Sequence, residues 1–246
     1  MEKDMTKGRP LPVILKFIIP LIIGNIFQQL YNMVDTIIVG RYVGADALAA
    51  VGSTGTIMFL IVGFAQGITA GFSVLTAQRF GAKDTEGVKI SVANGILLSL
   101  IFTIIISAFS MVSMHSLLKL MNTPDNIFED AYTYIMIISA GIIATIFYNL
   151  LSSSLRAVGN SKIPLVFLVF SAALNVILDL VLIVNVKMGV AGAAYATVIS
   201  QGISAILCLI YIYLRIPSLA PNRRHWKLHG QESRNQLAVG IPMALQ

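Results

Sequence analysis

Long stretches without a charged residue divide the chain into six apolar segments. Their approximate boundaries are 13–39, 49–77, 90–113, 131–151, 163–186 and 191–213. Each is close to, or above, the roughly 20 residues that a helix needs to cross the hydrocarbon core of a bilayer. Runs such as 101–106 are apolar on every side, whereas the strands of outer-membrane barrels alternate apolar and polar residues. One such run could be a buried helix of a soluble protein, but six in succession predict an all-α membrane protein with six transmembrane helices.

The composition argues against the soluble classes of protein. Hydrophobic residues make up 57% of the 246 residues and charged residues only 11%, against about 25% charged in an ordinary soluble domain. So few charges cannot cover a soluble fold of this size, which disfavours a soluble enzyme, a nucleic-acid-binding domain and a disordered protein. The single cysteine, Cys208, excludes a disulfide framework and a cysteine-based metal site. The sequence has no phosphate-binding loop or hydrolase motif, so we expect no enzymatic activity and no cofactor. The energy source is then an ion gradient or absent.

The positive charges are concentrated on one side of the predicted membrane. The N-terminal segment, the second and fourth loops and the segment after the sixth span hold 14 Lys and Arg residues; the other three are Arg41, Lys119 and Lys187. Lys and Arg collect on the cytoplasmic side, so we expect the N-terminus and residues 215–236 to be cytoplasmic. The basic loops suit anionic lipid head groups, whereas a nucleic-acid partner would need one continuous basic surface.

A further apolar run begins after the sixth span, at residues 237–246. Its Ile241-Pro242-Met243 aligns with Ile19-Pro20-Leu21 of the first span, 222 residues earlier. A seventh helix would enter from the same side as the first, as in transporters built from two parallel repeats. We therefore expect a cytoplasmic segment (1–12), a six-helix lobe (13–214), a cytoplasmic linker (215–236) and the start of a seventh helix (237–246) that belongs to a missing second lobe. The alternative is an amphipathic tail that lies on the membrane.

Two carboxylates lie inside the predicted spans, Asp35 in the first and Asp179 in the fifth. Each costs roughly 3 kcal/mol at the centre of a bilayer, so such residues commonly mark an ion or proton pathway; the alternative is a structural hydrogen bond between helices. Both lie in the outer half of spans that run in the same direction, so they could share one cavity. Two adjacent carboxylates cannot both ionise cheaply, which predicts a proton carrier or a cation site.

Neighbouring oxygen atoms complete the predicted site. Asn175 lies one helical turn before Asp179 and shares its face. In the sixth span, Thr197 and the backbone carbonyl of Ala193 come at a compatible depth. Oxygen ligands alone suit a hard cation, and since the set contains no histidine, we expect no metal other than Na⁺.

Two spans carry a distinctive helix face. The first has a polar stripe, with residues three or four positions apart: Asn25, Gln28 or Gln29, Asn32 and Asp35. We expect this face to line a cavity or a partner helix. Below the stripe, Pro20 removes a backbone hydrogen bond and makes a bend easier. In the second span, Gly63, Gly67 and Gly71 form a small-residue face that favours close helix packing.

Several segments together resemble the multidrug and toxic compound extrusion (MATE) transporters, over essentially all of residues 10–246. The segments are 19–21, 33–44, 49–52, 78–82, 155–162, 175–179 and 189–197. The resemblance implies the first lobe of a two-lobe antiporter that exports organic, often cationic, compounds in exchange for H⁺ or Na⁺ across a bacterial or archaeal cytoplasmic membrane. The pattern is most similar to the branch related to the DNA-damage-inducible F proteins. Without the second lobe, the central cleft has only one wall.

The resemblance also implies roles for particular residues. In that branch the first lobe holds the ion site, which here corresponds to Asp35, Asn175, Asp179, Ala193 and Thr197. Tyr134 and Asn149 match supporting polar positions. An interfacial anchor is the ordinary explanation for Tyr134, and the depth of Asn149 argues against contact with Asp179. Pro20 matches a proline around which bending of the first helix has been proposed.

Two other functions stay open. A flippase for lipid-linked intermediates would need a basic cavity for a pyrophosphate, and no Lys or Arg lies deep in any span. The other is a non-transporting scaffold or a half-size protein that dimerises. A homodimer of parallel halves would imitate two lobes, but residues 237–246 would then have no use. Oxygen ligands serve both H⁺ and Na⁺, so both coupling ions stay open.

Overall fold

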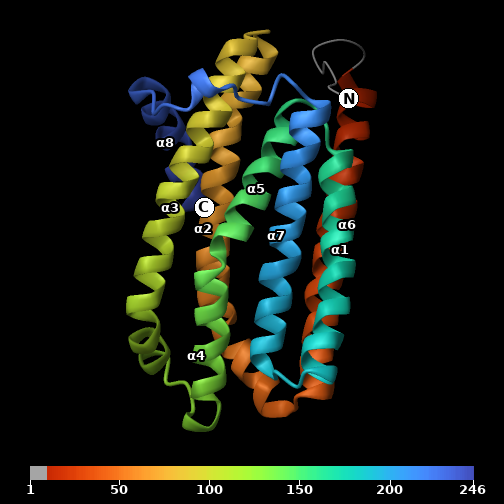
Figure 1. Cartoon of the computed structure of the whole chain (residues 1–246), viewed down its shortest axis with the longest axis vertical. Coiled ribbons are helices and arrows are strands. Elements are labelled where there is room, and N and C mark those ends of the chain that lie inside the picture. The colour runs from red at the N-terminus through yellow and green to blue at the C-terminus, as the bar shows by residue number, and fades with distance from the viewer. Residues whose placement is uncertain (1–9) are drawn as a thin grey trace.

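The computed structural model describes residues 10–246, apart from the side chains of Pro10 and Val13, and forms a bundle of long helices (Figure 1). The α-helices are α1 (Pro10–Tyr42), α2 (Ala45–Gly81), α3 (Thr85–Leu120), α4 (Asp125–Ala140), α5 (Ile142–Ala157), α6 (Lys162–Asp179), α7 (Val190–Arg215) and α8 (Gly230–Ala244). A π-helical turn, η1 (Leu180–Asn185), extends α6, and a 3₁₀ turn, η2 (Arg223–His225), precedes α8. Five helices are long and apolar enough to cross a membrane, and the bent pair α4–α5 makes up to six. The all-α fold and the six predicted spans are therefore confirmed.

The helices continue past the apolar segments because polar residues cap and extend them. The Asp84 carboxylate accepts a hydrogen bond from the backbone N–H of Gly87 at 2.8 Å and caps the start of α3. The side chain of Asn160 does the same for the backbone N–H of Ile163 at the start of α6, at 3.2 Å. Because of these caps, α3 and α6 begin directly after short turns.

The fourth span differs from the prediction of one helix, since α4 and α5 meet at Gly141 with a bend of 48°. The Ser107 hydroxyl of α3 donates a hydrogen bond to the backbone carbonyl of Ser139, just before the bend, at 2.8 Å. A Cβ on Gly141 would collide with the side chain of Val198 in α7. The lack of a side chain at Gly141 thus lets α7 approach the bend closely.

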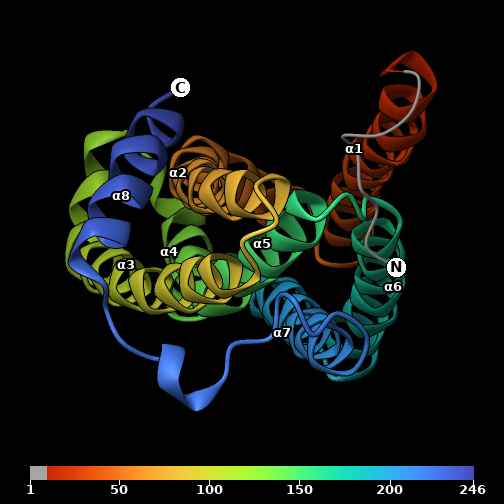
Figure 2. The same cartoon turned by 90° about the horizontal axis from the view of Figure 1, so that it is seen from above.

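One end of the bundle, at the top of Figure 1, carries the connections 82–84, 158–161 and 216–229. We call it the basic end, because most Lys and Arg residues of the described chain lie near it. Lys3, Lys7 and Arg9, which also supported the predicted orientation, lie outside the described residues. Figure 2 shows α1 at one side next to α6, while α8 lies on the opposite side against α2 and α3.

The last helix begins at Gly230, seven residues before the apolar run that predicted it. Its first turns are polar, but Glu232 and Gln236 are buried against α2 and α3. The small-residue face of α2 packs against this helix. A Cβ on Gly67 or Gly71 would collide with the backbone of α8, whereas the space around Gly63 is open. The predicted close packing is confirmed at Gly67 and Gly71, and α8 is the partner.

The buried apolar core is divided along the bundle. Near the basic end, Phe72, Leu151 and Ile212 belong to a cluster formed by α2, α3, α5 and α7. Toward the opposite end, Val39 and Ile183 belong to a second cluster formed by α1, α2, α4, η1 and α7, against which Val176 of α6 packs. The predicted carboxylates lie at this second cluster.

Candidate ion site

The structure brings Asp35, Asn175 and Asp179 together where α1 packs against α6 and α7. Asp35 is 9% exposed, and Asn175 and Asp179 are fully buried. The two carboxyl groups are close enough to interact electrostatically. This is the arrangement that their similar depth in parallel spans predicts. Neighbouring buried carboxyl groups can hold one proton between them.

Thr197 of α7 connects the other two helices of the site. Its hydroxyl oxygen accepts a hydrogen bond from the side-chain amide of Asn175 in α6, at 3.3 Å. The same oxygen lies 3.4 Å from the phenol oxygen of Tyr31 in α1. One hydroxyl therefore joins α1, α6 and α7, although the carboxylates themselves make no contact with it in the hydrogen-bond network.

Four buried oxygen atoms of the site lack a hydrogen-bond partner within the described part of the chain: Asp35 Oδ1, Asn175 Oδ1, Asp179 Oδ1 and Asp179 Oδ2. No salt bridge between described residues reaches either carboxylate. Buried acceptors without partners are costly, and buried charges are normally paired or bind a cation. The four oxygens are therefore suited to a proton or a small hard cation such as Na⁺. Among residues 10–246, no group of three or more His, Cys, Asp or Glu side chains is placed to hold a metal ion.

The π-helical turn positions Asp179 at the end of the regular part of α6. In this turn the backbone N–H of Val186 donates to the carbonyl of Val181 at 2.9 Å, one residue further back than in an α-helix. The following turn needs Gly189, whose φ of +58° few other residues adopt. A Cβ on Gly192 would press on Leu182 and Ile183 at 3.1–3.3 Å. These glycines allow α7 to return close to Asp179.

Tyr134 and Ala193 are both buried in the second apolar cluster. Tyr134 is 6% exposed and packs in the same apolar cluster as Ala193, which is fully buried. It lies within electrostatic range of Asp35, Tyr31 and Asp179. The explanation of Tyr134 as an interfacial anchor is therefore wrong, since an anchor would be exposed at the membrane surface.

A small cavity of about 50 Å³ lies between α1, α2, α5, α6 and α7. Its polar lining includes Gln28, Tyr31, Gln66, Thr145, Asn149 and Gln201. The Thr145 hydroxyl donates a hydrogen bond to the Gln201 carbonyl at 2.6 Å, and the Asn149 amide donates to the backbone carbonyl of Thr145 at 2.9 Å. The volume is enough for a water molecule or a small ion. Asn149 thus belongs to this cavity and not to the carboxylate pair.

The polar stripe of α1 is only partly turned inward. Asn25, Gln28 and Asn32 are all exposed, and of these only Gln28 lines the cavity. The inward face is formed by Gln28, Tyr31 and Asp35. Sequence reasoning missed Tyr31, although its position one turn before Asp35 puts it on the same face. Pro20 is buried, and α1 continues through it without a break.

Comparisons with known proteins point to one family. The family model MatE matches residues 20–181. The chain is 33% identical over 245 residues to the probable multidrug resistance protein YpnP of Bacillus subtilis (strain 168), covering 99% of this chain and 54% of that protein. It is 28% identical over 200 residues to the DNA damage-inducible protein F of Escherichia coli (strain K12), covering 79% of this chain and 42% of that protein.

Solved structures show the same likeness. A structure described as the outward-facing conformation of a multidrug resistance MATE family transporter of the MOP superfamily superposes with a TM-score of 0.88 and 30% identity, over 97% of this chain and 53% of that one. The chain therefore spans about half the length of the relatives that it matches.

Proposed function

Because the chain belongs to the MATE family, we propose that it is the ion-binding lobe of a membrane antiporter that exports organic, often cationic, compounds in exchange for H⁺ or Na⁺. The single observation that carries the proposal is the group of four buried, unpartnered oxygens on Asp35, Asn175 and Asp179. An arrangement that is costly when empty gains free energy when a cation or proton occupies it. That gain can be coupled to a change of conformation.

Tyr31 links the proposed ion site to the neighbouring cavity. It lies next to the Thr197 hydroxyl on one side and lines the cavity on the other. Neutralising the carboxylates removes the repulsion between them, so α1 repacks against α6 and α7. A repacked α1 moves Tyr31 and Gln28, and thereby displaces a compound bound along this face.

Transport needs a second wall for the central cleft, which we propose is the second lobe of a longer protein. The inward movement of one cation supplies about 2.3 kcal/mol per 100 mV of membrane potential.

Pro20 gives α1 a point at which it bends as the lobe repacks. No Lys or Arg of the described chain lines the cavity, so it offers a pyrophosphate no basic group, which disfavours the flippase.

The experiment compares charge-neutral variants of the full-length protein in energised membrane vesicles. We expect Asp35→Asn and Asp179→Asn to abolish efflux of a fluorescent organic cation driven by an H⁺ or Na⁺ gradient. The matched control is Asp46→Asn, because Asp46 is exposed at the start of α2, away from the site. Unchanged gradient-driven efflux in both site variants would overturn the proposal.

A further inference from the structure

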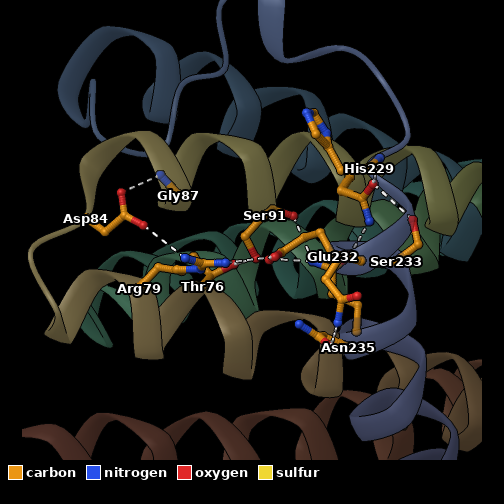
Figure 3. A network of polar contacts seen from close by, with 12 residues as sticks. Thr76, Arg79, Asp84, Gly87, Ser91, His229, Glu232, Ser233 and Asn235 are labelled. Atoms are coloured by element: carbon orange, nitrogen blue, oxygen red, sulfur yellow. Dashed lines mark hydrogen bonds and ion pairs between the residues drawn. The ribbon is translucent and has the colours of Figure 1, made fainter.

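The start of α8 is held against α2 and α3 at the basic end by a polar network that the ion site does not use (Figure 3). The helices α2 and α8 run antiparallel. Arg79 pairs with Glu232, and further along the same register Gly71 approaches Gly240. The two helices therefore pack side by side from the basic end into the apolar part of the bundle.

The centre of the network consists of buried amides. The Gln236 amide donates to the backbone carbonyl of Ser91 at 2.8 Å and accepts from the Asn94 amide at 2.9 Å. The side-chain oxygen of Asn94 in turn accepts hydrogen bonds from the backbone N–H of His229 at 3.0 Å and from the Ser233 hydroxyl at 3.2 Å. Both Asn94 and Gln236 are fully buried. Each amide thus bonds across the boundary between α3 and the segment around α8.

A charged pair closes the outer edge of the same boundary. The Arg79 guanidinium lies 3.2 Å from Glu232 Oε2 and 3.1 Å from Asp84 Oδ2. Glu232 is 5% exposed, and its other oxygen has no hydrogen-bond partner among the described residues. If Arg79 moved away, Glu232 would be left buried without a counter-charge, which is costly. The ion pair therefore stays formed unless both side chains become exposed to water.

The proposed two-lobe arrangement makes α8 the first helix of the second lobe. With the offset of 222 residues, α8 corresponds to the start of α1, which opens the first lobe. The positions that match Glu232, Gln236 and Gly240 are Pro10, Ile14 and Ile18. The start of α1 therefore has apolar residues where the start of α8 has Glu232 and Gln236. These two polar side chains of α8 bond to residues of α2 and α3.

We propose that this contact is a latch between the two lobes at the basic end, closed in the present structure and opened whenever the central cleft faces that side. The inference rests on the proposed two-lobe transport cycle. A latch made of amides and one ion pair can open repeatedly, since water replaces each hydrogen bond after separation. The close approach of Gly71 and Gly240 makes the closed state tight without interlocking side chains.

The test measures the distance across the latch in the full-length protein. Spin labels are attached at Thr85→Cys and Arg234→Cys, two exposed positions on α3 and α8, in a Cys208→Ser background. We expect Gln236→Leu to raise the population of the longer distance at least threefold. The matched control is Gln231→Leu, the same substitution on the same helix, because Gln231 is exposed and bonds only to Asn235 of α8.

A charge exchange gives a second, independent measurement. The exchange is made in an Asp84→Asn background, because Asp84 also pairs with Arg79. There Arg79→Glu opens the latch in the same way, and the combination of Arg79→Glu with Glu232→Arg closes it again, because the pair is restored with opposite signs. Unchanged distances in Gln236→Leu and Arg79→Glu, or an equal change in Gln231→Leu, would overturn the latch. The distances need neither substrate nor gradient, so failure of the latch is distinguishable from failure of ion-coupled export, which the efflux of the Asp35 and Asp179 variants reports.

Discussion

At the scale of single residues, the Thr197 hydroxyl is the point through which the proposed ion site reaches the cavity. It contacts a side chain of α6 and one of α1, but it is not one of the four unpartnered oxygens. Its role is therefore to position Asn175 and Tyr31. A positioning role predicts a change in ion affinity while the capacity to bind the ion is kept.

Thr197→Val keeps the shape of the side chain and removes the hydroxyl. A hydrogen bond contributes about 1 kcal/mol net, so we expect roughly a fivefold increase in the Na⁺ concentration, or in the H⁺ concentration, that gives half-maximal efflux. Thr197→Ser retains the hydroxyl and is expected to restore the parent value. Equal behaviour of the valine and serine variants in vesicles at a series of ion concentrations would contradict the positioning role.

At the scale of elements, the two breaks in helix regularity are the features that place the site. The bend at Gly141 lets α7 approach α4, and the π-helical turn follows Asp179 directly. Both involve the contact surface of α7, which carries Thr197. The site is thus set by how closely α7 packs between its neighbours.

Gly141→Ala tests the packing at the bend. The added Cβ would collide with the side chain of Val198, and overpacking of this kind costs about 1–3 kcal/mol. We expect a lower midpoint of thermal unfolding for the purified protein in detergent. Adding Val198→Ala makes room and should recover most of the loss. Gly55→Ala, with open space around the position, is the control; a similar loss there would show that the bend has no special packing.

The six spans and the meeting of Asp35 with Asp179 follow from the sequence because both depend on charge. A carboxylate in an apolar run is visible in the sequence, and the helical rise fixes its depth. The bend at Gly141 and the buried position of Tyr134 depend on contacts between helices that are far apart in the sequence. The same holds for α8, whose buried face is polar and so resembles an exposed one.

At the scale of the whole molecule, the apolar surface shows where membrane or a second lobe must lie. Along α1, the side chains of Ile22, Ile26 and Leu30 are exposed, and Figure 2 shows this helix set apart from most of the bundle. The exposed polar side chains Asn25 and Asn32 lie on the same helix. Lipid tails cannot form hydrogen bonds with amide side chains. We therefore infer that the face of α1 with Asn25 and Asn32 borders a water-filled cleft between two lobes.

The orientation of the molecule is the last property that the charges predict. The connections at the basic end hold an excess of Lys and Arg, and such an excess is retained in the cytoplasm. Lys227 and Asp130 are exposed at the two ends of the bundle. In intact cells that produce the full-length protein with Cys208→Ser, a membrane-impermeant maleimide should modify Asp130→Cys. Lys227→Cys should react only after the cells are made permeable. Labelling of Lys227→Cys in intact cells would show that the orientation is the reverse of the predicted one. The carboxylates would then lie nearer the cytoplasm than the outside.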